Sequence, residues 1–447
     1  QGDTRNVTEC TSQFALFSIG RRMVTASLVD TPLSGDIGVV VLSRVDRRHR
    51  VTERLAVTLS DRREAAKVRH SYTDLLRQRA YQIACGYEDA SDANTLRTDP
   101  AFQIALDRVP DPDAVLASQP TVSRFEQRRN ADLLTYSNAL CDLWIERLGR
   151  KARRSKRPVK IILDFDSTDL VTYGEQQLAL FHAHYGNYIY YPLLVFDQHG
   201  WPVAAMLRGG RTRSGGVVST LIRIYRRLVE AGLRFEMILR ADAGFSLPEL
   251  YQTCETLGVR YVIGLITHRS LTERLGPAMQ QARKIAKEKG AAKIITEFMM
   301  RWGRKTPHER RIVAKAEITS LGENPRFLIT NLEQNADAVY EFYTGRGQCE
   351  NNIKELKNAL FGDRMSCHSF AANQFRLLVH TTAYVLMYLL REELAGTNLA
   401  RVQMDTLRLR LLKVAAVVRV TARRIWLELS ASHPSAVLWP RLVPLLT

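Results

Sequence analysis

The stretch VKIILDFDS, residues 159–167, decides which fold we expect. Apolar and β-branched residues run from Val159 to Phe165 and end in acidic residues, which predicts a buried strand. Outward from this strand the pattern alternates between further strands and helices. The strands are expected at Tyr188–Asp197, Pro202–Arg208, Phe235–Leu239 and Arg260–Ile266, and the helices at Val217–Glu230 and Pro248–Leu257. Strands that alternate with helices indicate an α/β sheet.

After His268 the rhythm changes. A charged helix at Gln280–Lys289 precedes two strands at Arg310–Thr319 and Arg326–Asn331, with a turn at Gly322-Glu-Asn-Pro325 between them. This segment predicts a β-rich insertion in the α/β core. Beyond it, we expect helices at Ala336–Leu360 and Gln374–Leu394 and a small β-hairpin between Ala415 and Leu429.

The region upstream of the core is expected to be mostly helical. Ile37–Leu42 has the composition of a strand, and helical patterns follow from Asp61 to Tyr87, from Thr95 to Asp107 and from Ala131 to Leu148. Ser118–Glu126 fits the base-reading end of a recognition helix as well as an ordinary helix start. The basic run 147–160 indicates either a solvated linker or a phosphate contact. The expected units are therefore 1–60 of uncertain structure, 61–157 helical and DNA-binding with the basic linker, 158–267 first part of the core, 268–335 insertion, and 336–447 last part of the core with the C-terminal helices and hairpin.

Composition narrows the partner class. The 447 residues contain 64 Lys and Arg against 46 Asp and Glu, which gives a net charge of +18 and a pI near 9.8. Such a surplus favours polyanionic partners, although self-repulsion that limits aggregation is an alternative reading. The six cysteines form no C-x-x-C pair, so we expect neither a zinc site nor a disulfide framework. A reducing cytosol fits best, and we expect a cytoplasmic, nucleoid-associated protein. No signal peptide is visible, and the most apolar helical stretch, Leu377–Leu390, is too short to span a membrane.

Three acidic positions carry the candidate chemistry. Asp166 closes the strand at 159–165, Asp242 follows the strand that starts at Phe235, and Glu350 lies on an expected helix. Carboxylates at the ends of neighbouring strands converge outside the strand tips, and a third from a facing helix can complete a cage for hard cations. A single Asp at a strand end is more often a turn cap, but the three acids together, in a basic chain, favour a site for two Mg²⁺ ions, with Mn²⁺ as a substitute, of the kind that supports phosphoryl transfer.

The helix with Glu350 has a distinctive surface. Spacings of three, four and seven residues place Tyr343, Arg346, Glu350 and Lys357 along one helical face. This face offers one carboxylate as a metal ligand, two cations that can bind phosphates and one phenol that can form a hydrogen bond. A solvated stripe of paired charges is the alternative reading.

At this point the sequence resembles a known family. The Y-x-x-R-x-x-x-E-x-x-x-x-x-x-K arrangement, together with D-S-T at 166–168 and D-A-G-F at 242–245, looks like the DDE transposases of bacterial insertion sequences. The resemblance extends over residues 75 to 440, and its further segments are Tyr81-Gln-Ile-Ala-Cys-Gly-Tyr-Glu-Asp89, Ser118-Gln-Pro-Thr121, Phe181-His-Ala-His-Tyr-Gly186, Tyr191-Pro-Leu-Leu194 and Leu207-Arg-Gly-Gly210.

The resemblance implies a mobile-element endonuclease with a ribonuclease-H-like catalytic core. It implies that Asp166, Asp242 and Glu350 form the catalytic triad, and that Tyr343, Arg346 and Lys357 contact the transposon end. It also implies that the insertion, with Trp302 inside it, touches DNA near the cut. The alternative is that Trp302 only packs in the core of the insertion. We expect such an enzyme to bind terminal inverted repeats and target DNA, as a homodimer in the end-paired complex.

Two other classes of function compete with this interpretation. Asp164-Phe-Asp166-Ser-Thr168 also resembles the D-x-D-x-T motif of haloacid-dehalogenase-type phosphatases, in which Asp164 would be the nucleophile. Such enzymes need a later acidic pair, of which Gly362-Asp363 supplies half. A DNA-binding regulator without catalysis would use only the N-terminal helices and the basic linker. Neither alternative accounts for all three acids.

Overall fold

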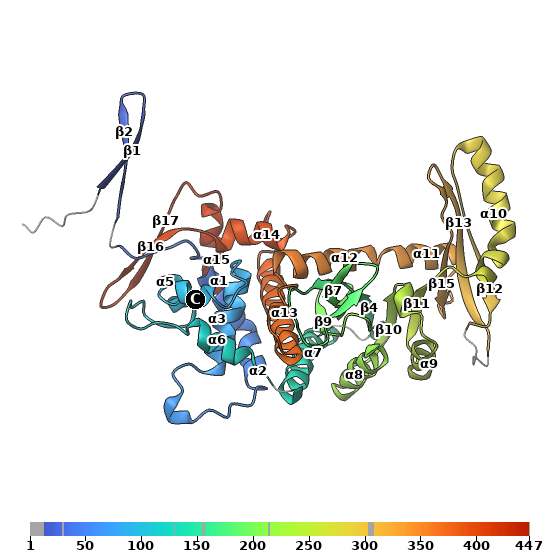
Figure 1. The fold of residues 1–447 in the computed structure, drawn as a ribbon, viewed down its shortest axis with the longest axis horizontal. Helices are drawn as coiled ribbons and strands as arrows, with labels where there is room; N and C mark the ends of the chain where they lie inside the picture. Colours follow the sequence, from blue (N-terminus) through green and yellow to red (C-terminus); the bar gives the residue numbers. More distant parts are fainter. Residues whose placement is uncertain are drawn as a thin grey trace, which may run out of the picture.

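The computed structural model describes residues 13–28, 31–128, 130–153, 157–212, 215–302 and 308–446. Over these residues the protein is a mixed α/β molecule, in which helices flank one large mixed sheet (Figure 1). The strand order across this sheet is β12-β13-β15-β11-β10-β4-β8-β9, with the short β14 paired to β13. The strands are β4 (Val159–Ser167), β8 (Leu193–Asp197), β9 (Pro202–Met206), β10 (Phe235–Ala241), β11 (Arg260–Leu265), β12 (Ala292–Met300), β13 (Arg310–Thr319), β14 (Gly322–Glu323) and β15 (Arg326–Thr330).

The strand expected at residues 159–165 lies at the centre of the sheet as β4. It runs parallel to β10 on one side and antiparallel to β8 on the other, and β10 in turn runs parallel to β11. Its side chains are buried on both faces, which is why the apolar run is nearly continuous. The helices α8 (Val217–Glu230) and α9 (Pro248–Leu257) have the bounds that the sequence predicted.

The expected insertion does not form a separate sheet. β15 pairs with β11 of the core, and β13 and β12 continue the same hydrogen-bonded surface. The helix α10 (Arg269–Lys289) is longer than expected and packs against β12 and β13 (Figure 1). The sequence pattern missed β12, whose alternation of half-buried and exposed residues is weak.

One expected strand is interrupted. Tyr188–Asp197 was predicted as a single strand, but β7 (Asn187–Tyr190) and β8 are separate elements on either side of Tyr191-Pro192. Proline has no N–H to donate to a ladder, so the pairing changes at this position. β7 instead joins β5 (Leu170–Val171) and β6 (Leu180–His182) in a small sheet of its own.

The N-terminal region is mostly helical, as expected, with one correction. The run Ile37–Leu42 was predicted as a strand, whereas α1 (Val39–His49) takes up most of it. Burial of its valines against α5 and α13 outweighs their preference for strands. The other helices of this region are α2 (Val51–Ala56), α3 (Tyr72–Ala84), α4 (Asp92–Leu96), α5 (Pro100–Ala105), α6 (Gln119–Glu126) and α7 (Asn130–Ala152).

The helix α13 (Phe370–Glu393) joins this region to the sheet. It is buried along most of its length and packs against α1, α3 and α7 as well as β9. No helix in the described part of the chain combines the length and apolar character needed to cross a bilayer. The C-terminal strands β16 (Ala416–Val420) and β17 (Ile425–Leu429) form the predicted hairpin, to which β3 (Leu33–Ser34) is added. In contrast, the hairpin of β1 (Gln13–Ile19) and β2 (Arg22–Ser27) projects from the body (Figure 1).

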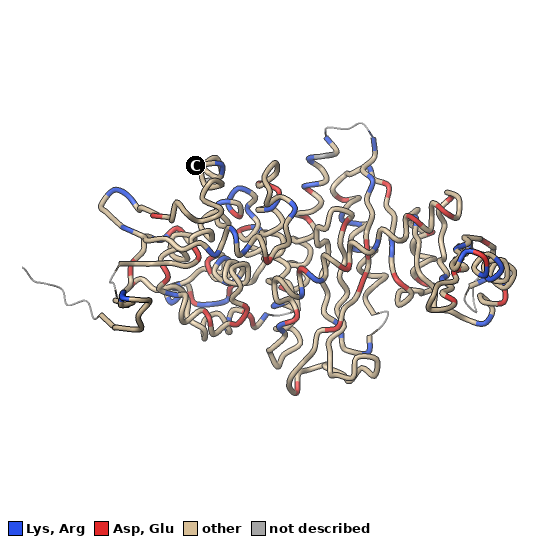
Figure 2. The backbone as a smooth tube through the Cα atoms, turned by 90° about the horizontal axis from the view of Figure 1, so that it is seen from above, with Lys and Arg blue, Asp and Glu red and all other residues tan. Residues whose placement is uncertain are grey.

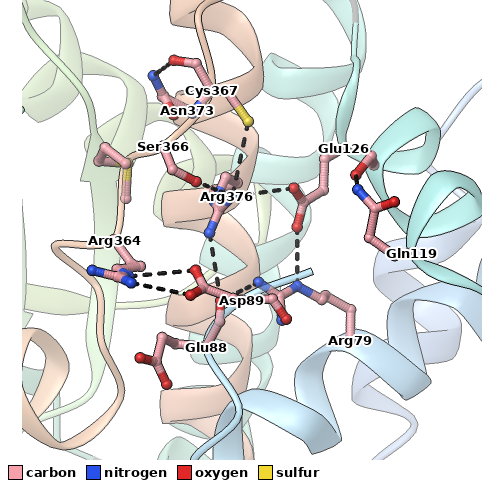
Figure 3. Close-up of polar contacts among 12 residues, drawn as sticks. Arg79, Glu88, Asp89, Gln119, Glu126, Arg364, Ser366, Cys367, Asn373 and Arg376 are labelled. Atoms are coloured by element: carbon pink, nitrogen blue, oxygen red, sulfur yellow. Dashed lines mark hydrogen bonds and ion pairs between the residues drawn. The ribbon is translucent and has the colours of Figure 1, made fainter. Parts of the chain in front are cut away.

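Buried ion pairs tie α3 and α6 to α13 (Figure 3). Arg79 donates to one oxygen of Glu126 at 3.0 Å, and Arg376 lies 3.5 Å from the other. All three side chains are at most 4% exposed. Arg79 also donates to backbone carbonyls in the segment 87–89, and nearby Asp89 pairs with Arg364 at 3.0 Å. The N-terminal helices and α13 therefore share one polar core.

Five of the six cysteines lie within the described residues. Cys85, Cys141, Cys254, Cys349 and Cys367 are free thiols, and Cys10 lies outside the described residues. Part of the predicted basic linker, Arg154 and Lys156, also lies outside them.

Candidate active site

Asp166 and Asp242 meet at one edge of the sheet. Asp164 pairs in register with Arg240 and Phe165 with Ala241, so the next residues on the parallel strands come level with each other. The Asp242 carboxylate accepts a hydrogen bond from the Gly244 nitrogen at 2.9 Å, which fixes it in the turn after β10. The sequence-based expectation that these two acids lie on neighbouring strand ends agrees with this placement.

Asp166 is the more enclosed of the two carboxylates. It is 6% exposed and accepts hydrogen bonds from the Ser167 nitrogen at 2.8 Å and from Arg346 Nη1 at 2.7 Å. Burial raises the pKa of Asp166 to about 6, Arg346 opposes this rise, and the charge of Asp242 adds to it. The rise in pKa therefore comes mainly from the removal of Asp166 from water, since Arg346 lowers the pKa by more than Asp242 raises it.

The acidic helix faces these carboxylates, but it is not the single helix that the sequence predicted. Residues 336–360 divide into α11 (Ala336–Thr344), α12 (Gly347–Lys354) and a π-helical turn at Glu355–Ala359. Arg346 stands at the break and Glu350 lies in the first turn of α12. The buried side of α12, which includes Cys349, packs on β4 and β8.

Glu350 does not yet join the two aspartates. Its side chain is 56% exposed, and its carboxylate lies 3.7 Å from Arg346 Nη2. Among the described residues, no three acidic, histidine or cysteine side chains lie close enough together to hold a metal ion. Carboxylate oxygens are nevertheless the donors that Mg²⁺ requires, and an exposed glutamate changes rotamer readily. Asp166 and Asp242 therefore supply donors of the kind that fit a divalent cation, whereas Glu350 does not complete the set in this structure.

Tyr343 and Lys357 lie on either side of this group. Tyr343 approaches the sheet at Gly264 of β11, where an added Cβ would stand 3.0 Å from the tyrosine Oη and 2.9 Å from the Ala243 nitrogen. Lys357 donates from Nζ to the Asp169 carbonyl at 2.8 Å and lies 3.1 Å from its carboxylate. Both residues of the predicted helix face thus border the site.

Asp164, two residues before Asp166, has a structural role. It forms a two-bond ion pair with Arg240, at 2.7 and 2.8 Å, and both side chains are at most 8% exposed. Arg240 also donates to the Phe342 carbonyl at 2.9 Å, which fastens α11 to the sheet. Arg240 was not among the residues predicted for the site, although its position next to Asp242, at the end of a buried strand, could have indicated a buried partner for Asp164.

Trp302 lies elsewhere in the structure. Trp302 follows β12. The strand pairing across β13, β15, β11 and β10 puts Met299 of β12 level with Asp164 of β4. The end of β12 is therefore level with the middle of β4, below the strand ends that carry Asp166 and Asp242. The Trp302 ring is half-buried and meets the His268 ring edge-on at 6.3 Å.

Comparisons with known proteins agree with the family expected from the sequence motifs. Residues 17–446 match the family model of the transposase DDE domain group 1. No significant match was found among curated proteins. Among solved structures, the chain is similar to a cryo-EM structure of the piggyBac transposase synaptic complex with hairpin DNA, at 12% identity and a TM-score of 0.36, covering 85% of this chain and 86% of that chain. Because the family model spans nearly all of its length, the chain belongs to the transposase DDE domain group 1 family.

Proposed function

We propose that the protein is a DNA transposase that cleaves the ends of an insertion sequence and joins them to target DNA. In this proposal Asp166, Asp242 and Glu350 form the catalytic triad of a ribonuclease-H-like core. The observation that carries it is the level placement of Asp166 and Asp242 at one sheet edge, with Arg346 reaching from Asp166 toward Glu350.

The topology supports the core assignment. Three antiparallel strands, β9, β8 and β4, are followed across the sheet by two strands parallel to β4, which are β10 and β11. The first two acids follow the carboxyl ends of β4 and β10, where α/β sheets carry their ligands. Two Mg²⁺ ions, when bound, would stabilise the charge that develops on the attacking and leaving oxygens.

In this proposal the side chains of the site have different roles. Asp166 and Asp242 are held by backbone N–H groups and form the fixed part of the acidic site, whereas exposed Glu350 is the adjustable part. We propose that Arg346 and Lys357 leave their carboxylate partners to bind DNA phosphates, and that Tyr343 donates a hydrogen bond to the same strand. Trp302 lies away from the strand ends that carry Asp166 and Asp242, so its proposed contact with DNA would be outside the acidic site.

The net charge of +18 supports a polyanionic partner such as DNA. Figure 2 shows Lys and Arg residues, interspersed with Asp and Glu, along the length of the molecule. We further propose that two copies pair two terminal inverted repeats, which the mass of the protein–DNA complex in solution would test.

The central experiment compares Asp242→Asn and Glu350→Gln with the wild type. The substrate is a duplex with the terminal sequence of the DNA element that encodes the chain, incubated with Mg²⁺ or with a chelator. We expect both variants, and the wild type with chelator, to bind the duplex but to leave it uncut. The matched control is Glu341→Gln, an exposed acid on α11, which should cleave normally. Cleavage by either triad variant at the wild-type rate would remove that residue from the site.

A phosphatase of the haloacid-dehalogenase type is the second candidate, because Asp164 has the nucleophile's place in D-x-D-x-T. The two-bond ion pair with buried Arg240 counts against it, since both Asp164 oxygens are engaged away from solvent. Turnover of a small phosphate ester that depends on Asp164, without DNA cleavage, would favour the phosphatase.

A further inference from the structure

A cluster of rings stands on the small sheet next to the acidic site. We call His182, His184, Tyr185 and Tyr191 the ring cluster. The His182 ring lies against Tyr191 at 5.9 Å between centroids, with only 26° between the planes, and against Tyr185 at 5.1 Å. His184 meets Tyr185 edge-on at 4.9 Å. The rings thus form one continuous aromatic surface between β6 and the start of β8.

Arg208 joins this surface to the strand of Asp166. Its Nη2 donates to Ser167 Oγ at 2.6 Å, and Ser167 is the residue directly after Asp166. Its Nε donates to the Tyr191 carbonyl at 2.8 Å, and the guanidinium carbon stands 5.6 Å from the centre of the Tyr191 ring. Because Arg208 is only 4% exposed, this connection fixes the position of Tyr191 relative to Asp166.

Electrostatic coupling points to the same proximity. Burial raises the pKa of Tyr185, and the charges of Asp169, Asp166 and Asp242 raise it further. Burial also raises the pKa of Tyr191, together with the neighbouring Tyr185 and the charge of Asp242. Together with the Arg208 link to Ser167, this coupling places the ring cluster near the carboxylates, and Lys357 is bound to Asp169, which is also coupled to Tyr185.

The ring cluster is open to a ligand. His184 is exposed and Tyr185 is partly exposed, so ring surface remains accessible. His182 Nδ1 is buried and has no hydrogen-bond partner among the described residues. A buried imidazole nitrogen without a partner is costly unless something else supplies one.

Resting on the proposed function, we propose that the ring cluster binds an unpaired nucleobase of the DNA strand whose phosphate lies at Asp166 and Asp242. A nucleobase supplies what the site lacks, a flat π-face for Tyr185 and a polar edge for His182 Nδ1. Base–aromatic stacking is tolerant of sequence and needs only that the base has left the duplex. Lys357, bound to Asp169, and Arg346, bound to Asp166, supply the cations for the phosphates of the same strand.

The test measures binding to two probes that differ only in the unpaired base. One is a short blunt duplex, and the other is the same duplex with a single-stranded overhang that carries 2-aminopurine. We expect the protein to bind the overhang probe more tightly than the blunt probe, and to quench the fluorescence of 2-aminopurine through stacking. Equal affinity for the two probes with no quenching would overturn the proposal.

Variants assign the effect to the ring cluster. We expect Tyr185→Ala and His182→Ala to weaken overhang binding about 5- to 100-fold while affinity for the blunt duplex stays the same. Tyr185→Phe, which keeps the ring, should retain most of the quenching. Tyr173→Ala is the matched control, because Tyr173 is 89% exposed and stands outside the ring cluster on the same segment. Equal losses on both probes would mean that the rings only support the small sheet, and would overturn the proposal, as would unchanged quenching in Tyr185→Ala and His182→Ala.

Failure of the ring-cluster proposal can be distinguished from failure of the proposed function, because probe binding is measured without Mg²⁺. It is measured with cleavage-deficient Asp242→Asn as well as with the wild type. A protein that cuts end-containing DNA but ignores the overhang keeps the transposase function and loses the ring-cluster proposal. A protein that quenches the probe through Tyr185 but never cuts DNA keeps the ring-cluster proposal and loses the transposase function.

Discussion

Arg346 donates a hydrogen bond to Asp166 and at the same time lies 3.7 Å from Glu350, so one guanidinium is shared by two acids from different elements. The neighbouring charges of Asp166 and Asp242 act to raise the pKa of Arg346, which keeps the guanidinium charged. The Arg346 guanidinium therefore neutralises part of the negative charge that these two acids carry.

We therefore predict that Arg346→Ala binds Mg²⁺ more tightly than the wild type in the absence of DNA. Removal of one charged competitor should increase the affinity about tenfold, which a calorimetric titration measures. The same variant should lose DNA affinity, with a log–log salt slope smaller by about one. Arg269→Ala is the control, because Arg269 is 88% exposed and pairs within α10. An unchanged Mg²⁺ affinity would contradict the competition.

The Asp164–Arg240 pair leads to a prediction about stability. Asp164→Asn leaves a buried guanidinium without its carboxylate, so we expect the free energy of unfolding in urea to fall by about 3–5 kcal/mol. The double variant Asp164→Leu with Arg240→Met should recover much of the loss. Across the neighbouring strands β10 and β11, Glu236 and Arg260 form a pair in which each side chain is at least 40% exposed, and Glu236→Gln should cost less than about 1 kcal/mol. Equal effects of Asp164→Asn and Glu236→Gln would show that burial does not matter here.

Gly264 is predicted to be essential for the geometry of the site. Gly264→Ala forces a Cβ to within 2.9 Å of the backbone nitrogen after Asp242, so either the turn or Tyr343 must move. We expect cleavage of end-containing DNA to fall by about tenfold or more, with a loss of stability of about 1–3 kcal/mol. Gly276→Ala in α10 is the matched control, because a Cβ there meets nothing within 4 Å and alanine favours the helix. Normal cleavage by Gly264→Ala would mean that the strand adjusts freely.

His380 predicts how stability depends on pH. It is fully buried on α13, and burial, with the charges of Arg79 and Arg376, lowers its pKa well below the usual 6.5. The unfolded chain therefore takes up a proton as the pH falls below 6.5 while the folded protein does not, so stability is lost toward acid pH. His380→Asn should flatten the unfolding free energy between about pH 7.5 and pH 5.5, a change of up to about 1.4 kcal/mol per pH unit. Exposed His199→Asn should keep the wild-type slope, and a wild-type slope in His380→Asn would reject the assignment.

Local sequence patterns were sufficient for the strands that carry Asp166 and Asp242. A buried strand that ends in an acid is visible in a few consecutive residues, and the helix after each strand has clear periodicity. Likewise, the spacing of Arg346 and Glu350 brought both residues to one side of the chain despite the break in the helix.

Relationships between distant residues were not accessible in this way. Arg240 finds Asp164 only because β4 and β10 are adjacent and in register, and Gly264 matters only because Tyr343 packs above it. The helix α1 was mistaken for a strand because its valines favour strands locally, whereas their burial depends on helices farther along the chain, α5 and α13.

Glu126 forms ion pairs with both Arg79 and Arg376, which are separated by most of the chain. The N-terminal helices are therefore not an interchangeable module. A hybrid gene that replaced the residues before Asn130 with those of another protein would leave Arg376 buried without its acid, at a cost of several kcal/mol. Recombination between relatives succeeds only if positions 79, 126 and 376 are inherited together, so these three positions should change in concert as the lineage diverges.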